Sequence, residues 1–300
     1  MYEVITVTPG SETLLEPLGT KEKFWFELPP DQRLLFKRSL PGSGEHWAEK
    51  TVAVLCVELG LPHASYELAT YEDQQGVVTP MFVPNDARFV FGNELLARFH
   101  ADYPGQQKYK VSQHTLSRVM AVIRSTEIDT PMDWECPAEV ANPHGVFLGY
   151  LMLDCLVANQ DRHDQNWGLI ASTSTQRIYL CPTFDHGSSL GRNETDQARE
   201  DRLTTKDAGR AMPVYVRRAR TAFYESTTSK KSMFTLDAYV AWAKTHPAAR
   251  RYWEKRLRAL SLDRVKEIFN NVPDTMIGDL ARKFACEIIR LNRERILGLV

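Results

Sequence analysis

One segment, residues 151–191, restricts the fold of this chain more than any other. A helix-like apolar run leads to Asp161, and Asn166 follows after four intervening residues. Two strand-like runs, joined by a turn of Ser and Thr, come next and end at Asp185. Because loops braced by regular elements commonly carry catalytic groups, we expect these three side chains to share one site. The elements predicted around them are a helix over 146–157 and strands over 167–171 and 177–184.

The spacing of these side chains is typical of phosphoryl transfer. In such sites one carboxylate orients the attacking hydroxyl, while an amide and a second carboxylate hold Mg²⁺ on the phosphates of a nucleotide. Protein kinases have the order His-Arg-Asp-x4-Asn and then Asp-Phe-Gly. Here His163 follows the first acid, and the later triplet runs from Asp185 to Gly187. A polar hairpin whose Asp and Asn side chains only cap turns is the alternative interpretation.

The composition fits one bilobal domain or two closely packed ones. The chain has 300 residues, of which 43% are hydrophobic, and its formal charge of −1 argues neither for nor against a nucleic-acid partner. The sequence has no apolar run of membrane-spanning length, and its first ten residues lack a signal-peptide pattern. The five cysteines are scattered, which predicts reduced core thiols rather than a zinc site. We therefore expect a cytoplasmic protein that binds no membrane.

Residues 1–84 are predicted to form a β-rich lobe. Within it, Gly19 has small and basic neighbours, Thr20, Lys21 and Lys23, and this segment can fold over phosphates through its backbone N–H groups. A plain hairpin turn is the alternative. The lobe is predicted to contain strands over 2–8, 23–27, 33–38, 64–71 and 76–83 and a helix over 44–60.

Lys37 and Glu49 are candidates for an ion pair beside a nucleotide. Lys37 lies inside an apolar strand, where a lysine is commonly an edge residue or reaches to solvent. Its alternative role is that of the strand lysine that contacts phosphates. Glu49 lies early in the predicted helix over 44–60, where the helix dipole alone favours a glutamate. It is also placed to hold Lys37 by ion pairing.

A boundary between two lobes is predicted at Pro84 and Asn85, and the backbone just before it is placed to receive an adenine edge. The remainder is expected to be mostly helical, with a polar segment over 192–232 that is suited to be mobile. Two basic clusters, at 216–220 and 250–258, are better explained as solvated helix faces than as nucleic-acid patches. The helices are predicted over 92–102, 112–126, 144–158, 235–244, 247–259, 261–270 and 275–297.

Together these residues resemble the HipA-like serine/threonine kinases over most of the chain from 14 to 297. The resemblance implies an α+β, bilobal protein-kinase-like fold, with a small β-rich N-lobe over 1–84 and a larger, mostly helical C-lobe over 85–300. It also implies ATP and Mg²⁺ as cofactors and transfer of the γ-phosphoryl group to a serine or threonine of a protein, including the chain itself. The matching segments are Leu18–Trp25, Leu35–Lys37, Glu49, Glu58–Leu61, Ala158–Asn166, Phe184-Asp185 and Asn292-Arg293.

By position, the resemblance implies that Asp161 is the catalytic base and that Asn166 and Asp185 are metal ligands. It also implies that Lys37 binds phosphates and that Glu49 braces it. His163 joins the candidate catalytic residues, and Thr20 is the first candidate for self-phosphorylation. The remaining candidates for nucleotide contact are Gly19, Thr20, Lys21, Lys23, Met81, Phe82 and Val83.

The resemblance further implies a protein substrate and an antitoxin-like partner. The Asp-Arg-His order and the Asp-x-Gly triplet are also similar to phosphoinositide kinases, so a lipid kinase is an alternative. Residues 192–210 mix both signs of charge, which favours a protein substrate over an inositol phosphate. A nucleotide-binding pseudokinase that acts as a binding module is the alternative from another class.

Overall fold

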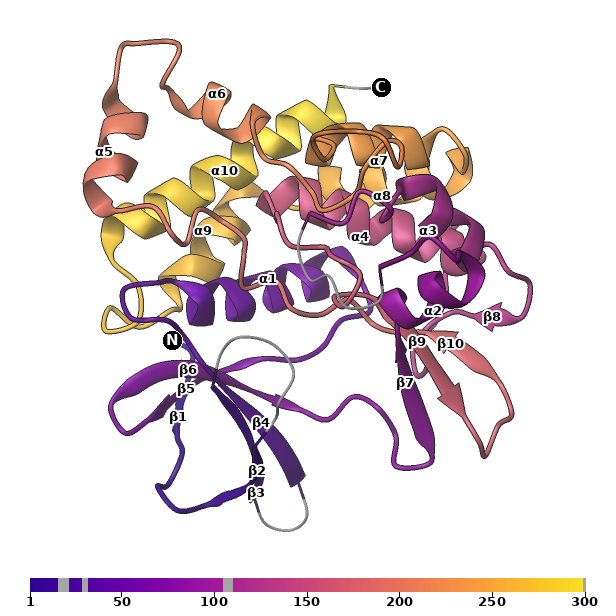
Figure 1. Ribbon diagram of the computed structural model, residues 1–300. Helices are drawn as coiled ribbons and strands as arrows, with labels where there is room; N and C mark the ends of the chain where they lie inside the picture. The colour runs from indigo at the N-terminus through magenta and orange to yellow at the C-terminus, as the bar shows by residue number, and fades with distance from the viewer. Residues whose placement is uncertain (16–21, 29–31, 105–109, 299–300) are drawn as a thin grey trace.

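The computed structural model describes residues 1–15, 22–28, 32–104 and 110–298 (Figure 1). The predicted phosphate-loop residues Gly19, Thr20 and Lys21 lie outside these ranges, whereas Lys23 lies within them. The described chain forms a strand-rich N-terminal part and a helix-rich C-terminal part, which confirms the predicted α+β fold class. None of its described helices is long and apolar enough to cross a membrane.

The N-terminal part is built on a six-stranded sheet with the order β1-β5-β6-β4-β3-β2. β1 runs parallel to β5, and the other pairs are antiparallel. One face buries an aromatic cluster in which Phe24 lies 5.1 Å from Phe36 and 4.8 Å from Tyr71 between ring centroids. The strands are β1 (Val4–Thr6), β2 (Glu12–Leu15), β3 (Lys23–Leu28), β4 (Gln32–Arg38), β5 (Glu67–Tyr71) and β6 (Gln74–Pro80).

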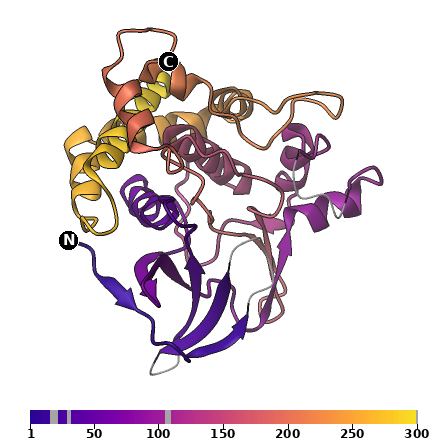
Figure 2. The same ribbon diagram turned by 60° about the vertical axis from the view of Figure 1, so that its left-hand side comes forward.

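Helix α1 (Glu45–Leu59) lies between this sheet and the C-terminal helices, as two views show (Figures 1 and 2). Most of its residues are buried, Val52 and Leu55 completely, because the sheet covers one side and the C-terminal helices the other, whereas Val57 is 61% exposed. Gly60 ends the helix in the left-handed conformation at φ +72°, which glycine adopts without the steric cost of a Cβ. The helix predicted over 44–60 is confirmed.

The C-terminal part begins with a second sheet of order β7-β9-β10-β8. The centre of the C-terminal part is helix α4. This helix is buried along its whole length because nearly all of its side chains are apolar. The strands are β7 (Ala87–Phe91), β8 (Ile128–Asp129), β9 (Gly168–Ser172) and β10 (Ile178–Leu180). The helices are α2 (Gly92–Phe99), α3 (Leu116–Ile123), α4 (Pro143–Val157), α5 (Asp196–Thr204), α6 (Met212–Arg217), α7 (Thr235–Ala243), α8 (Pro247–Ala259), α9 (Leu262–Asn270) and α10 (Asp279–Leu297).

All seven helices predicted beyond residue 85 are present, although α2 and α3 are shorter than expected. The structure adds β2, β7, β8 and two short helices, α5 and α6, within the polar segment over 192–232. α5 is capped by Thr195, whose side chain accepts a hydrogen bond from the Ala198 N–H. The first sheet ends at Pro80 and the second begins at Ala87, so the predicted division at residue 84 falls between them and stays a prediction.

Candidate active site

Lys37 joins the two parts of the molecule. Its Nζ lies 2.7 Å from Glu49 Oε1 and 3.0 Å from Asp185 Oδ1. The lysine and glutamate side chains are only 10% and 3% exposed. β4 lies between β3 and β6, so Lys37 is not on an edge strand. The alternative of an edge or solvent-reaching lysine is therefore wrong. Lys37 of β4 instead contacts Glu49 of α1 and Asp185, which follows β10.

The charges of this cluster hold Lys37 in its protonated form. Burial alone would lower the pKa of Lys37, but the carboxylates of Asp185 and Glu49 outweigh it, and the pKa lies well above its usual value. Burial raises the pKa of Glu49, and Lys37 opposes that rise. A buried lysine that faces two carboxylates is thus a fixed positive charge at neutral pH.

The backbone at Asp185 is held in an uncommon conformation. Its φ is +56°, in the left-handed region that a residue with a Cβ adopts at a cost of about 1–2 kcal/mol. Two hydrogen bonds hold it there: the Asp185 N–H donates to Tyr66 Oη at 3.1 Å, and the His186 N–H donates to Glu49 Oε2 at 2.7 Å. Such strain is characteristic of functional sites, and here it directs a carboxylate at Lys37.

A buried ion pair between Arg162 and Asp154 holds the loop that carries Asp161. Arg162 is 1% exposed, and it donates through Nε to Asp154 Oδ2 at 2.9 Å and through Nη2 to Asp154 Oδ1 at 2.8 Å. Its Nη1 donates to the Asn166 carbonyl at 2.9 Å. A bidentate guanidinium–carboxylate pair has a fixed geometry, so the loop is fixed relative to α4. The sequence signal for this anchor is Asp154 itself, an acid inside a fully apolar helix.

Two amides orient the loop further. Asn159 donates through Nδ2 to Asp154 Oδ1 at 2.8 Å, and its Oδ1 accepts from the Asp161 N–H at 3.1 Å. Asn166 donates through Nδ2 to the Asp161 carbonyl at 2.7 Å. With its nitrogen used in this way, the Oδ1 of Asn166 is the side-chain atom suited to a cation. The Asp161 carboxylate is 40% exposed, and its Oδ2 accepts from Ser188 Oγ at 3.3 Å.

The loop and the Asp185 segment share one buried hydrogen-bond network. Arg162 Nη2 donates to Thr183 Oγ1 at 2.9 Å and lies 3.2 Å from His186 Nε2, which is 2.8 Å from Thr183 Oγ1. Burial and the charge of Arg162 lower the pKa of His186 well below its usual value. The ring is therefore neutral, and its Nε2 accepts hydrogen bonds. Sequence reasoning did not identify Thr183 or His186 as members of the site.

His163 lies beside Asp161, with Nε2 3.8 Å from Asp161 Oδ1, which is too long for a hydrogen bond. Its Nδ1 accepts from the Gln165 N–H at 3.1 Å, so in the neutral ring the proton is on Nε2. Burial would lower the pKa of His163, but Asp164, Asp161 and Asp185 raise it overall. The structure thus places a titratable ring next to the exposed carboxylate.

The connection between the two parts passes an apolar wall. The Phe82 ring lies 5.5 Å from the Phe184 ring, and both pack against a small cluster that includes Tyr66. Tyr66 also faces Lys37, whose Nζ is 5.4 Å from its ring. An apolar surface of this kind suits a flat base. Met81 is 39% exposed and Val83 is partly buried.

Lys23 lies directly opposite Lys37 in the pairing of β3 with β4. Residues opposite each other in an antiparallel pair are on the same face, so the two lysines are neighbours. Lys23 thus adds a second positive charge beside Lys37, whose own charge faces Glu49 and Asp185.

Oxygen atoms dominate the possible metal ligands here. Asn166 contributes an amide oxygen and Asp185 a carboxylate, the ligand types that Mg²⁺ prefers when it also binds phosphates. Among the described residues, no group of three or more His, Cys, Asp or Glu side chains is placed to hold a metal ion.

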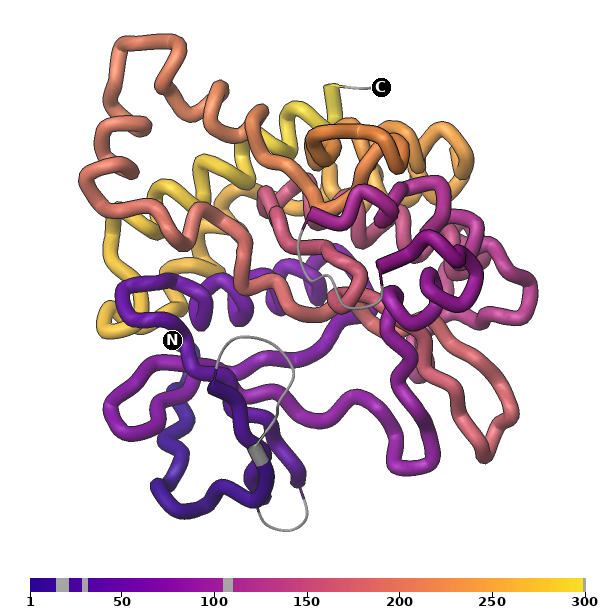
Figure 3. The backbone as a smooth tube through the Cα atoms, in the orientation of Figure 1, coloured from indigo at the N-terminus to yellow at the C-terminus, as the bar shows by residue number. Residues whose placement is uncertain are grey.

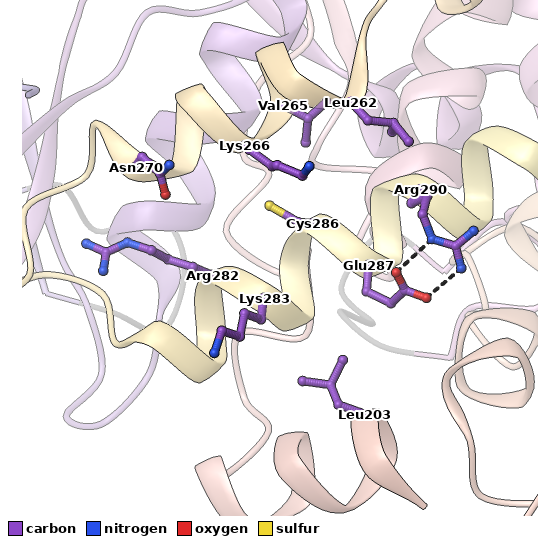
Figure 4. Close-up of a pocket in the computed structure, with 10 residues that line it drawn as sticks. All are labelled: Leu203, Leu262, Val265, Lys266, Asn270, Arg282, Lys283, Cys286, Glu287 and Arg290. Carbon is purple, nitrogen blue, oxygen red and sulfur yellow. Dashed lines mark hydrogen bonds and ion pairs between the residues drawn. The ribbon is translucent and has the colours of Figure 1, made fainter. Parts of the chain in front are cut away.

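A cavity of about 530 Å³ lies away from these residues, between α9 and α10 (Figure 4). Its wall is mainly apolar, and the close-up shows Lys266 and Cys286 facing one another across it. Arg290 in its rim donates to Glu287 Oε2 at 2.8 Å and to Glu294 Oε1 at 2.7 Å. This guanidinium is thus already paired within α10.

Comparison with solved structures adds to this geometry. The Helicobacter pylori proinflammatory kinase CtkA superimposes with a TM-score of 0.69 at 16% identity, over 99% of this chain and 97% of that one. HipA of the Shewanella oneidensis toxin–antitoxin system, in a complex with HipB and operator DNA, matches with a TM-score of 0.57 at 11% identity, over 97% of this chain and 67% of that one. The chain has the fold of HipA-like kinases. These two superpositions confirm the predicted fold. No family model and no curated protein matches the sequence.

Proposed function

We propose that this HipA-like chain is an ATP- and Mg²⁺-dependent kinase that phosphorylates serine or threonine in a protein, itself included. The observation that carries the proposal is the continuity of the site. Lys37, Glu49 and Asp185 form one charged cluster, and Asp185 is joined through the Thr183, His186 and Arg162 network to the loop of Asp161 and Asn166. Kinase chemistry requires these groups on two sides of one nucleotide.

In this proposal the residues divide the work. Lys37 contacts the nucleotide phosphates, helped by Lys23, and Glu49 keeps it in place. Asn166 and Asp185 would hold Mg²⁺, which would supply positive charge to offset the negative charge of the phosphates. Gly19, Thr20 and Lys21 are proposed to cover the phosphates, and Met81, Phe82 and Val83 to border the base.

Asp161 is the proposed catalytic base. Its carboxylate is exposed enough to meet a protein hydroxyl, and its Oδ2 accepts from Ser188, which fixes the orientation of the group. A carboxylate in this position accepts the hydrogen bond of the attacking hydroxyl and then its proton. His163, next to Asp161 Oδ1, is proposed to tune that carboxylate.

The proposal includes a protein partner. The HipA structure is a complex with HipB. By analogy we propose an antitoxin-like partner for this chain, to be identified by affinity capture with the purified protein and confirmed with the purified partner.

Two variants and one control test the assignment. Wild-type protein incubated with labelled ATP and Mg²⁺ should label itself or a protein of a cell lysate. Asp161→Asn should lower turnover by roughly 10²-fold or more, because it removes the base, while Mg²⁺-dependent ATP binding persists. Asp185→Asn should abolish both turnover and the Mg²⁺-dependent part of binding. Asp263→Asn, whose side chain is 94% exposed on α9, should behave like the wild type.

Calorimetric titration with ATP, with and without Mg²⁺, accompanies the transfer assay. Labelling of phosphoinositide vesicles but not of protein would establish the lipid-kinase alternative. ATP binding without transfer to any acceptor would establish the pseudokinase. Full Mg²⁺ dependence in Asp185→Asn would show that the metal assignment is wrong.

A further inference from the structure

A second cavity, of about 270 Å³, borders the loop of the candidate active site. Gln160, which directly precedes Asp161, forms one wall. The Gln160 N–H donates to the Ser188 carbonyl at 3.4 Å, and Ser188 Oγ donates to Asp161 Oδ2 at 3.3 Å. One wall of the cavity therefore belongs to the loop that carries the proposed catalytic base.

The opposite wall comes from α5, α6 and the turn between them, and it is basic. It contributes three guanidinium groups, of Arg202, Arg210 and Arg218, against the single carboxylate of Glu194. Arg202 lies 3.4 Å from Glu194 and stacks 4.7 Å from the centre of the Tyr215 ring, so these groups form a fixed floor.

The two outer arginines differ in what they contact. Arg210 pairs with Asp201 at 3.4 Å and with Asp207 at 3.1 Å, and these side chains are exposed, so water screens both pairs. Arg218 is exposed, and with the residues that the structure describes its guanidinium makes no hydrogen bond or ion pair. Arg218 thus gives the cavity a positive charge that no described carboxylate pairs with, and Gln160 of the catalytic loop lines the same cavity.

We propose that this cavity binds an acidic side chain of the protein substrate, a few residues from the serine or threonine that accepts phosphate. The proposal rests on the proposed function and specifies its substrate. The cavity wall at Gln160 is one residue from Asp161, and an extended peptide advances about 3.3 Å per residue, so a side chain near the acceptor is within reach of the cavity. The planar guanidinium of Arg218 matches a carboxylate with two parallel hydrogen bonds.

The test uses short peptides with one serine or threonine and a glutamate moved through the flanking positions. The same peptides with glutamine serve as references. Wild-type protein should prefer glutamate at one position by about tenfold in kcat/KM. Arg218→Ala should remove this preference without changing activity on the glutamine peptides, and Arg218→Glu should transfer the preference to lysine.

Arg217→Ala is the matched control, because Arg217 is the exposed neighbour of Arg218 and does not line the cavity. It should keep the preference. Equal preference in the Arg217 and Arg218 variants, or no preference in the wild type, overturns the proposal.

A second measurement separates this proposal from the proposed function. Fluorescence anisotropy of a labelled glutamate peptide, without nucleotide, should show binding that weakens in high salt and in Arg218→Ala. If the wild type transfers no phosphate, the proposed kinase function fails, yet binding still depends on Arg218 if the cavity is an acidic-peptide site. Binding that is identical in both arginine variants refutes the cavity site even when phosphate is transferred.

Discussion

Removal of the Lys37 charge gives a sharp test of the candidate site, because it leaves two carboxylates facing each other. In Lys37→Met the apolar stem is kept, but Glu49, which is buried, and Asp185 lose their shared cation. Breaking a buried ion pair by removing one partner costs roughly 3–5 kcal/mol. With a shift of about 2 °C per kcal/mol for a chain of this size, the melting temperature should fall by roughly 6–10 °C at pH 7.5. Nucleotide affinity should fall as well.

The loss should depend on pH in a defined direction. Burial already raises the pKa of Glu49, and Lys37 is the group that opposes this rise. Without Lys37 the folded-state pKa of Glu49 rises further above the unfolded value of about 4.3. A carboxyl with a raised folded pKa is most favourable when protonated, so the deficit relative to the wild type is full above the folded pKa. It should shrink as the pH falls through that pKa toward the unfolded value.

Lys50→Met is the matched control. Lys50 lies on the same helix as Glu49, and its Nζ is 2.6 Å from Glu67 Oε2, but that carboxylate is 47% exposed. Water can solvate the abandoned glutamate, so the cost should be about 1 kcal/mol or less. The double variant Lys37→Met, Glu49→Gln should recover part of the loss of Lys37→Met, because it removes one of the two unpaired charges.

The assay is thermal unfolding of the nucleotide-free protein between pH 5 and pH 8. A Lys37→Met variant that melts within about 1 °C of the wild type would refute the reasoning. So would a deficit that is equal at all pH values, or one no larger than that of Lys50→Met.

Three further predictions follow from other residues. Gly19→Val should raise the KM for ATP in a steady-state assay, because a side chain there would keep the backbone from close approach to phosphate; an unchanged KM would leave only a hairpin turn. Arg162→Met leaves Asp154 buried and unpaired, so it should lower stability by about 3–5 kcal/mol, read as a drop in melting temperature larger than that of Arg217→Met. Burial lowers the pKa of His114 to about 4, so stability should fall as the pH drops below about 6.5 toward 4, by ~2 kcal/mol at pH 5, and His114→Gln should lose less over that range.

The elements with strong periodicity were predictable from the sequence. α1, α4 and α10 carry long apolar patterns, and the hairpin of β9 and β10 follows from two apolar runs around a polar turn. α5 was not predictable in this way because it is polar on nearly every side, and its stability depends on a cap and on contact with α10. β7 was missed because its pairing with β9 joins residues about 80 positions apart, and local pattern gives no sign of such a partner.

For the site, the sequence indicated the candidate catalytic and binding residues but not the buried residues that hold them in place. The ion pair of Lys37 and Glu49 was expected, and the structure adds the contact of Lys37 with Asp185, while the roles of these residues stay predictions. The support from Asp154 and Arg162 was missed because a buried ion pair is recognised only when both partners are placed in space. Its one local signal is an acid within an apolar helix.

Helix α1 connects both sides of the candidate site, and this follows from two glutamates one turn apart. Glu49 contacts Lys37 and the backbone of His186, whereas Glu45 accepts a hydrogen bond from Arg192. The backbone trace shows the segment around Arg192 beside the start of α1 (Figure 3), where the Gly44 N–H donates to the Arg192 carbonyl at 3.2 Å.

Arg192 also donates to Ser188 Oγ at 3.3 Å, and Ser188 donates to Asp161. One helix is thus linked to the lysine on the proposed phosphate side and, through two side chains, to the proposed base. The contacts of Glu49 are buried, and those of Arg192 and Ser188 are partly buried, so a displacement of α1 would disturb both sets together. Both the contact of Lys37 with phosphate and the orientation of Asp161 in the proposed reaction therefore depend on the position of this helix.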